Sequence, residues 1–231
     1  MSEAGLGPLQ VPESVFALLR GSDGEGVMGR ALVLAQHASA DAATRYLREA
    51  RAAALGEGGA AGATGVQVVH KQAALVLLEG PSEALHEFCF RLHRDAQSGG
   101  SPFSAARVAC LCDDVPARTF QTWSEAVLTV PKEVNVALPE DSLTGCIGDL
   151  YSRTLAIGAA LGKSQAPSRL EDCKNRSGDL FCSQERILAM IKHQHITTVE
   201  EFFELYGTSV DAQTLGDDVW PMQALEVDLQ L

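Results

Sequence analysis

The sequence predicts an α+β fold in which two helices cover one face of a single β-sheet, followed by a mainly helical extension. Three observations lead to this prediction. Between residues 26 and 131, short apolar runs of strand length alternate with two longer helical segments. The second helical segment carries its apolar side chains on one stripe, as a helix on a sheet does. From residue 132 onward the apolar residues recur at helical spacing, and the segment is acidic in composition.

The first part of the sheet region contains one strand and one helix. Residues 28–36 form a compact apolar run around Ala31-Leu32-Val33-Leu34, which is typical of a buried central strand. Residues 42–55 are rich in Ala, Arg, Glu and Leu, which are strong helix formers. The glycines of Gly56-Glu57-Gly58-Gly59 then suit a helix end and a loop.

The second part supplies four more strands and the clearest helix. Residues 66–70 and 73–78 predict two strands joined by a tight turn, and residues 107–112 and 123–130 predict the last two. Residues 82–95 predict a helix with apolar side chains at i, i+3, i+4 and i+7. These side chains are Leu85, Phe88, Cys89 and Leu92. The resulting order, β-α-β-β-α-β-β, is ferredoxin-like.

Two further regions flank this α+β domain of residues 26–131. Residues 1–25 form a leader with one short amphipathic helix, which either packs back on its own domain or docks on a partner. Residues 132–231 form a helical acidic extension. The residues predicted to contact partner proteins are Val15, Phe16, Leu19 and Trp220. We expect deletion of residues 1–25, or truncation before Ser142, to abolish partner binding while the core stays folded.

The extension is predicted to contain three helices. One begins at Ser142 and continues through Leu155, and two shorter ones cover residues 185–192 and 199–206. Thr198 and Glu201 have the spacing of a capping box. Residues 164–178 between these helices are interpreted as a polar break.

Charge and composition exclude several classes of function. The 231 residues carry a net charge of −12, which disfavours binding to nucleic acid or to an anionic membrane surface. The N-terminal residues lack the charge and apolar core of a signal peptide, and no run reaches the roughly 18 apolar residues that span a membrane. We therefore expect a cytoplasmic protein.

No catalytic, cofactor-binding or metal-binding residues are predicted. The six cysteines are expected to be free thiols, and Cys110 and Cys112 share a strand face without further ligands at zinc-site spacing. His193 and His195 are interpreted as surface side chains. Signatures of serine hydrolases, nucleotide-binding loops and zinc proteases are absent from the sequence. An enzyme would therefore need a pocket built from dispersed residues.

Four features of the sequence form a pattern when they are taken together: Gly62-Ala63-Thr64-Gly65, Leu78-Glu79-Gly80-Pro81, Asp95 and the block from Arg118 to Ser124. In this order and spacing they resemble the BLUF family of flavin-binding blue-light sensors, which have a ferredoxin-like fold. The resemblance covers roughly residues 28–130. It implies a BLUF-type sheet for this part of the chain.

The positions at which that family handles its flavin hold different chemistry here. The resemblance places Val33 at the strand-one tyrosine and Val76 at the strand-three glutamine, so the phenol and amide of the photocycle are missing. Ala74 replaces the usual aromatic residue, and the stretch 52–61 replaces a flavin-contacting asparagine. The resemblance therefore implies a member without the photocycle and without a flavin cofactor.

The chain is most similar in this respect to flavin-less BLUF-like proteins of animals and flagellated algae, including a testis-expressed one. This resemblance implies a non-enzymatic assembly subunit of a ciliary or flagellar axonemal complex. Its partners would be other proteins, and it would bind the axoneme through an adaptor protein. Nucleic acid, membranes and small-molecule substrates are not expected as partners. The alternative is a flavin-binding BLUF-type sensor that lacks the normal photocycle.

Overall fold

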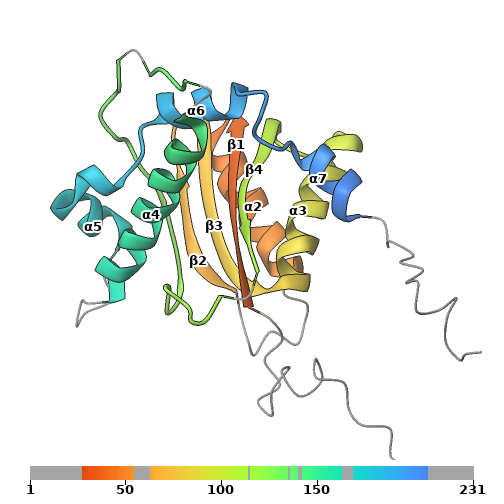
Figure 1. Cartoon of the computed structure of the whole chain (residues 1–231), viewed down its shortest axis with the longest axis horizontal. Helices are drawn as coiled ribbons and strands as arrows, with labels where there is room; N and C mark the ends of the chain where they lie inside the picture. The colour runs from red at the N-terminus through yellow and green to blue at the C-terminus, as the bar shows by residue number, and fades with distance from the viewer. Residues whose placement is uncertain are drawn as a thin grey trace, which may run out of the picture.

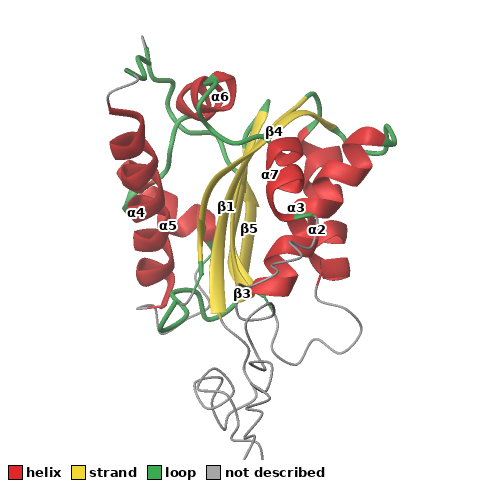
Figure 2. Ribbon diagram, turned by 45° about the vertical axis from the view of Figure 1, so that its right-hand side comes forward, coloured by secondary structure: helices red, strands yellow, loops and turns green. Residues whose placement is uncertain are grey.

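The computed structural model describes residues 28–54, 63–113, 115–134, 136–139, 142–162 and 169–207. In this part of the chain a five-stranded sheet lies between two helical layers (Figure 1 and Figure 2). The strands are β1 (Met28–His37), β2 (Thr64–Val69), β3 (Ala73–Pro81), β4 (Phe103–Cys112) and β5 (Trp123–Val127). The helices are α2 (Ala40–Ala54), α3 (Ser82–Gln97), α4 (Leu143–Gly162), α5 (Leu170–Arg176), α6 (Gln184–Lys192) and α7 (Val199–Tyr206), with a short 3₁₀ helix, η2, at Gly178–Leu180.

The strands are arranged in the order β4-β1-β3-β2-β5. The first four are antiparallel to their neighbours, and β5 adds to the edge parallel to β2. The order of β1 to β4, with helices between β1 and β2 and between β3 and β4, is that of a ferredoxin-like sheet. The predicted α+β fold class is confirmed.

One face of the sheet is covered by α2 and α3, as predicted. All four residues of the predicted α3 stripe are buried: Leu85, Phe88, Cys89 and Leu92. They pack against alternate residues of the central strands, including Val33 and Val76. Helix α7 extends this layer by packing beside α3 (Figure 1).

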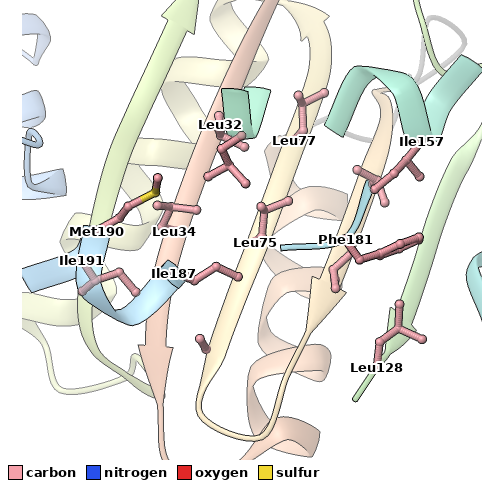
Figure 3. Close-up of a cluster of buried hydrophobic side chains, with 14 of the residues drawn as sticks. Leu32, Leu34, Leu75, Leu77, Leu128, Ile157, Phe181, Ile187, Met190 and Ile191 are labelled. Atoms are coloured by element: carbon pink, nitrogen blue, oxygen red, sulfur yellow. The ribbon is translucent and has the colours of Figure 1, made fainter. Parts of the chain in front are cut away.

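The opposite face is covered by helices from the C-terminal part of the chain. Successive strand residues point to opposite faces, so Leu32, Leu34, Leu75 and Leu77 form the second core. Figure 3 shows these leucines meeting Ile157 of α4, Phe181, and the apolar residues of α6. Both sides of the central strands are therefore buried, and the described helices α4, α5 and α6 contribute to the core of the sheet domain.

One segment differs from its sequence-based prediction. Residues 164–178 were interpreted as a polar break, but they contain α5, whose Leu170 and Cys173 are buried against the second core. The pattern was missed because a seven-residue helix shows only one apolar pair at helical spacing. Within the described residues, none of the helices combines the length and the hydropathy that a bilayer crossing requires.

Candidate functional site

Val33 and Val76 lie side by side on the sheet face beneath α2 and α3. They are direct partners in the antiparallel pairing of β1 and β3, and each is 1% exposed. Apolar side chains of both helices pack over them, among them Leu47 and Phe88. The two positions that the resemblance assigns to flavin photochemistry are thus occupied by core packing.

Gln67 is a polar residue in the same row that the sequence analysis did not single out. It pairs with Val76 across β2 and β3, so both side chains project from the same face. Gln67 is fully buried, and neither its amide oxygen nor its nitrogen has a hydrogen-bond partner among the described residues. An unsatisfied buried polar group costs about 1–3 kcal/mol. The signal in the sequence is one glutamine between two valines of a buried strand.

The motifs that carry the resemblance meet at one end of the sheet, around the buried carboxylate of Glu79. Arg30 donates from Nε to Glu79 Oε1 at 2.6 Å, and the backbone N–H groups of Thr119 and Phe120 donate to the carboxylate at 2.9 Å each. Thr64 donates its hydroxyl to Oε2 at 3.2 Å. These contacts hold the loop between β4 and β5 against the sheet, which gives the motif residues a structural role.

Arg30 ties the same loop to α4. Its Nη2 donates to the carbonyl oxygen of Ala117 and to Thr119 Oγ1, both at 2.8 Å, and its Nη1 donates to Tyr151 Oη at 3.3 Å. Burial alone would lower the pKa of Arg30, but the hydrogen bonds to Tyr151 and Glu79 raise it, so the guanidinium stays charged. The network thus joins the sheet, a loop and the helical extension.

Gly65 allows β2 to pass close to β3 at this corner. Its φ is 141°, and a Cβ at this position would lie 2.0 Å from the carbonyl oxygen of Leu77. A side chain therefore cannot be accommodated there. Gly65 belongs to the Gly-x-Thr-Gly motif, and the first glycine of that motif, Gly62, lies outside the described residues.

A cleft of about 450 Å³ opens on the opposite side, between the segment after β5, α4, η2 and the start of α6. Leu150 and Phe181 form part of its apolar floor, and charged side chains surround it. Cys182 also lines the cleft. Burial raises the pKa of its thiol to about 12, so the thiol is neutral at physiological pH. The sequence analysis did not predict this cleft, because its lining comes from four separate segments.

Glu133 and Arg186 form a paired group on the wall of this cleft. Arg186 donates to both carboxylate oxygens of Glu133, from Nε to Oε2 at 3.0 Å and from Nη2 to Oε1. Ser183, the N-cap of α6, donates to Glu133 Oε2 at 2.9 Å. The hydrogen bond from Arg186 lowers the pKa of Glu133. This carboxylate is therefore held in its charged form.

The other residues considered from the sequence are placed as follows. Cys110 and Cys112 project to one strand face with their sulfurs 3.4 Å apart, and the described residues contain no cluster of three or more potential metal ligands. His195 is exposed and His193 is half-buried beside it. The predicted partner contacts Val15, Phe16, Leu19 and Trp220 lie outside the described residues.

A model of one protein family, described as testis-expressed protein 47, matches residues 31–208. The chain belongs to the testis-expressed protein 47 family. The matched region begins within β1 and extends through the end of α7. This membership agrees with the predicted similarity to a testis-expressed protein.

A similar solved structure is that of a bacterial light-regulated adenylyl cyclase, with 13% sequence identity and a TM-score of 0.33. The aligned region covers 71% of this chain and 40% of the cyclase, so the chain spans less than half of that protein's length. A TM-score this low carries no functional argument. Among curated proteins, none matches the chain.

Proposed function

We propose that this member of the testis-expressed protein 47 family is a non-enzymatic assembly subunit that binds other proteins. The observation that carries the proposal is the apolar packing of Val33 and Val76 beneath α2 and α3. A flavin site needs donors and acceptors for the ring carbonyls and nitrogens, and these two positions supply none. A sheet that is covered by helices on both faces can serve as a rigid scaffold, with binding sites on the surface of the protein.

The cleft beside α6 supports a binding role more than a catalytic one. The carboxylate of Glu133 is bonded to the guanidinium of Arg186, and the thiol of Cys182 is neutral. Catalytic acids and bases instead need free positions and pKa values near the working pH. Ion-paired walls with an apolar floor are the ordinary composition of a protein-binding surface.

We further propose that the assembly is ciliary or flagellar, with the protein as a structural component of an axonemal complex. The family description names the testis, where sperm flagella are built, and the sequence resembles flavin-less proteins of flagellated organisms. The net charge of −12 would repel an acidic filament surface, so binding through an adaptor protein fits this charge.

Crosslinked affinity capture from ciliated cells, read by mass spectrometry, tests this proposal. We expect axonemal proteins to be recovered, with crosslinks on the surface lysines of the helical extension. The matched control is the same capture from cells of a non-ciliated line. Recovery of the same proteins from both lines, or of none from ciliated cells, would contradict an axonemal role.

A second candidate, a flavin-binding protein without the normal photocycle, is favoured by one observation. The buried amide of Gln67 has no partner among the described residues and projects from the face beneath α2 and α3. An amide in this position could donate to and accept from a ring. Purified protein that is yellow, with flavin released by acid and lost in Gln67→Leu, would support it. Colourless protein without releasable flavin would remove it.

A further inference from the structure

The cleft beside α6 differs in charge from the rest of the chain. Acidic side chains outnumber basic ones 30 to 18 in the whole sequence. Around the cleft the balance is reversed, because four basic residues face three acidic ones. The basic residues are Lys132, Arg153, Lys174 and Arg186, and the acidic residues are Glu133, Asp149 and Asp179.

The ion pairs within the cleft leave two cations and one carboxylate, that of Asp179, without an ion-pair partner among the described residues. Arg186 pairs with Glu133, and Arg153 pairs with Asp149 at 2.9 Å. Lys132 and Lys174 take part in no ion pair within the described residues, although both line the cleft. Two ammonium groups against one remaining carboxylate leave a net positive charge at the cleft, which favours an incoming anion.

One carboxylate of the protein, that of Glu133, is already bound at the cleft. Glu133 enters from the segment after β5 and is held by Arg186 and by the hydroxyl of Ser183. The buried floor next to it is apolar, with Leu150 2% and Phe181 5% exposed. A ligand for the rest of the cleft therefore needs carboxylates for the rim and an apolar side chain for the floor.

We propose that this cleft binds an acidic segment of a partner protein, with Lys132 and Lys174 contacting its carboxylates and the floor at Leu150 and Phe181 receiving an apolar side chain. The proposal rests on the proposed function as an assembly subunit, and it names the chemistry of the partner. The charge complementarity is local, so it operates in spite of the acidic charge of the whole chain.

The probe is a fluorescein-labelled peptide of alternating glutamate and leucine, whose binding to the full chain is followed by fluorescence anisotropy. We expect saturable binding that weakens with added salt, and weaker binding of a glutamine–leucine peptide. Lys132→Glu combined with Lys174→Glu should weaken the binding about tenfold. Asp179→Asn removes a rim carboxylate and should tighten it. These opposite signs distinguish a specific cleft from a general effect of charge.

The matched control combines Lys71→Glu with Lys192→Glu. It changes the net charge by the same amount at exposed lysines that do not line the cleft. Equal weakening in the control and in the cleft variant would overturn the proposal, as would the absence of binding to the glutamate peptide. A peptide of residues 208–231, which has acidic and apolar residues of its own, is a second probe. Tighter binding of this peptide than of the glutamate–leucine peptide would reassign the cleft to the chain's own tail.

Failure of this inference can be told apart from failure of the proposed function. The cleft variant and its control are both used in the capture from ciliated cells. Loss of axonemal partners only in the cleft variant supports both proposals. Equal capture by the two variants removes the cleft as the docking site while the assembly role stands, and no capture by the unmodified protein contradicts the assembly role itself.

Discussion

Glu79 connects the sheet to the loop that precedes β5 through hydrogen bonds from Arg30, Thr119 and Phe120. The side chains of Arg30 and Glu79 are only 11% and 1% exposed. Glu79→Ala would leave the guanidinium of Arg30 without its carboxylate partner, and removing one member of a buried ion pair costs about 3–5 kcal/mol. We expect a loss of this size in the free energy of unfolding, measured by urea titration.

The control for this prediction is Glu87→Ala. Glu87 pairs with Arg94 on the surface of α3, where the two side chains are 44% and 55% exposed. An exposed pair contributes at most about 1 kcal/mol. Similar urea midpoints for the two variants would show that the buried network adds little to stability.

The histidines His37 and His70 are each 3% exposed, and burial lowers the pKa of both. In the unfolded chain they bind protons below about pH 6.5, whereas the folded protein keeps them neutral to lower pH. The unfolded state then binds more protons, so the free energy of unfolding falls as the pH drops below about 6.5. Each histidine contributes a slope of up to about 1.4 kcal/mol per pH unit.

This pH dependence is measured by urea unfolding between pH 5 and 8. His37→Gln combined with His70→Gln should flatten the decline below pH 6.5, whatever its effect on stability at pH 8. His195→Gln, at an exposed histidine, is the control and should keep the decline. An unchanged slope in the double variant would show that the two histidines do not cause it.

For individual residues, the sequence identified the motif residues that meet around Glu79, but it could not predict which of them contact one another. Glu79, Thr64 and the block from Arg118 follow one another as separate segments, and only the sheet order brings them together. The sequence shows Val33 and Val76 as apolar replacements, and the structure adds that they pair directly across β1 and β3. Gln67 was missed because a single polar residue in a strand is usually exposed, and burial depends on which face a helix covers.

At the scale of elements, periodicity predicted most boundaries to within a few residues. Helices α6 and α7 lie at 184–192 and 199–206, and the predicted capping box is present, with Glu201 N donating to Thr198 Oγ1 at 3.0 Å. Strand β5 ends at Val127, earlier than expected, because its pairing with β2 ends there. Short helices such as α5 cannot be predicted from hydrophobic periodicity, because their stability depends on tertiary packing.

Helix α7 is attached to α3 mainly through aromatic rings. The ring of Phe203 stacks on His93 at 4.4 Å between centroids and meets Phe90 edge-on at 5.3 Å. Phe203→Ala should therefore loosen α7, which Phe202 still anchors, and lower the protection of its amides against hydrogen exchange, while the sheet stays protected. Leu205→Ala, on the same helix but 65% exposed, is the control and should have no such effect. Equal protection in the two variants would mean that these rings do not hold the helix.

For the whole molecule, the central question is how the sheet region and the helical extension depend on each other. The continuous apolar run of β1 indicated a buried central strand, and the structure shows helices on both of its sides. Which helices cover the second face could not be predicted from the sequence, because several amphipathic segments follow the sheet. The answer matters for experiments that divide the chain between residues 131 and 142.

Truncation before Ser142 was expected to leave a folded core, but the packing of the second face predicts the opposite. It would expose Leu32, Leu34, Leu75 and Leu77, which are at most 4% exposed in the full chain. Burial of one such side chain stabilises a fold by about 1.5–3 kcal/mol, so exposing all four costs about 6–12 kcal/mol, which is comparable to the whole stability of a typical domain. We expect the truncated protein to bind a hydrophobic dye, to aggregate and to melt without a cooperative transition. Removal of residues 208–231 alone leaves every described core residue in place and serves as the control. A truncated form that stays monomeric and melts cooperatively would show that the sheet and its two helices are an independent domain. Only in that case could a loss of partner binding on truncation be assigned to a missing binding surface.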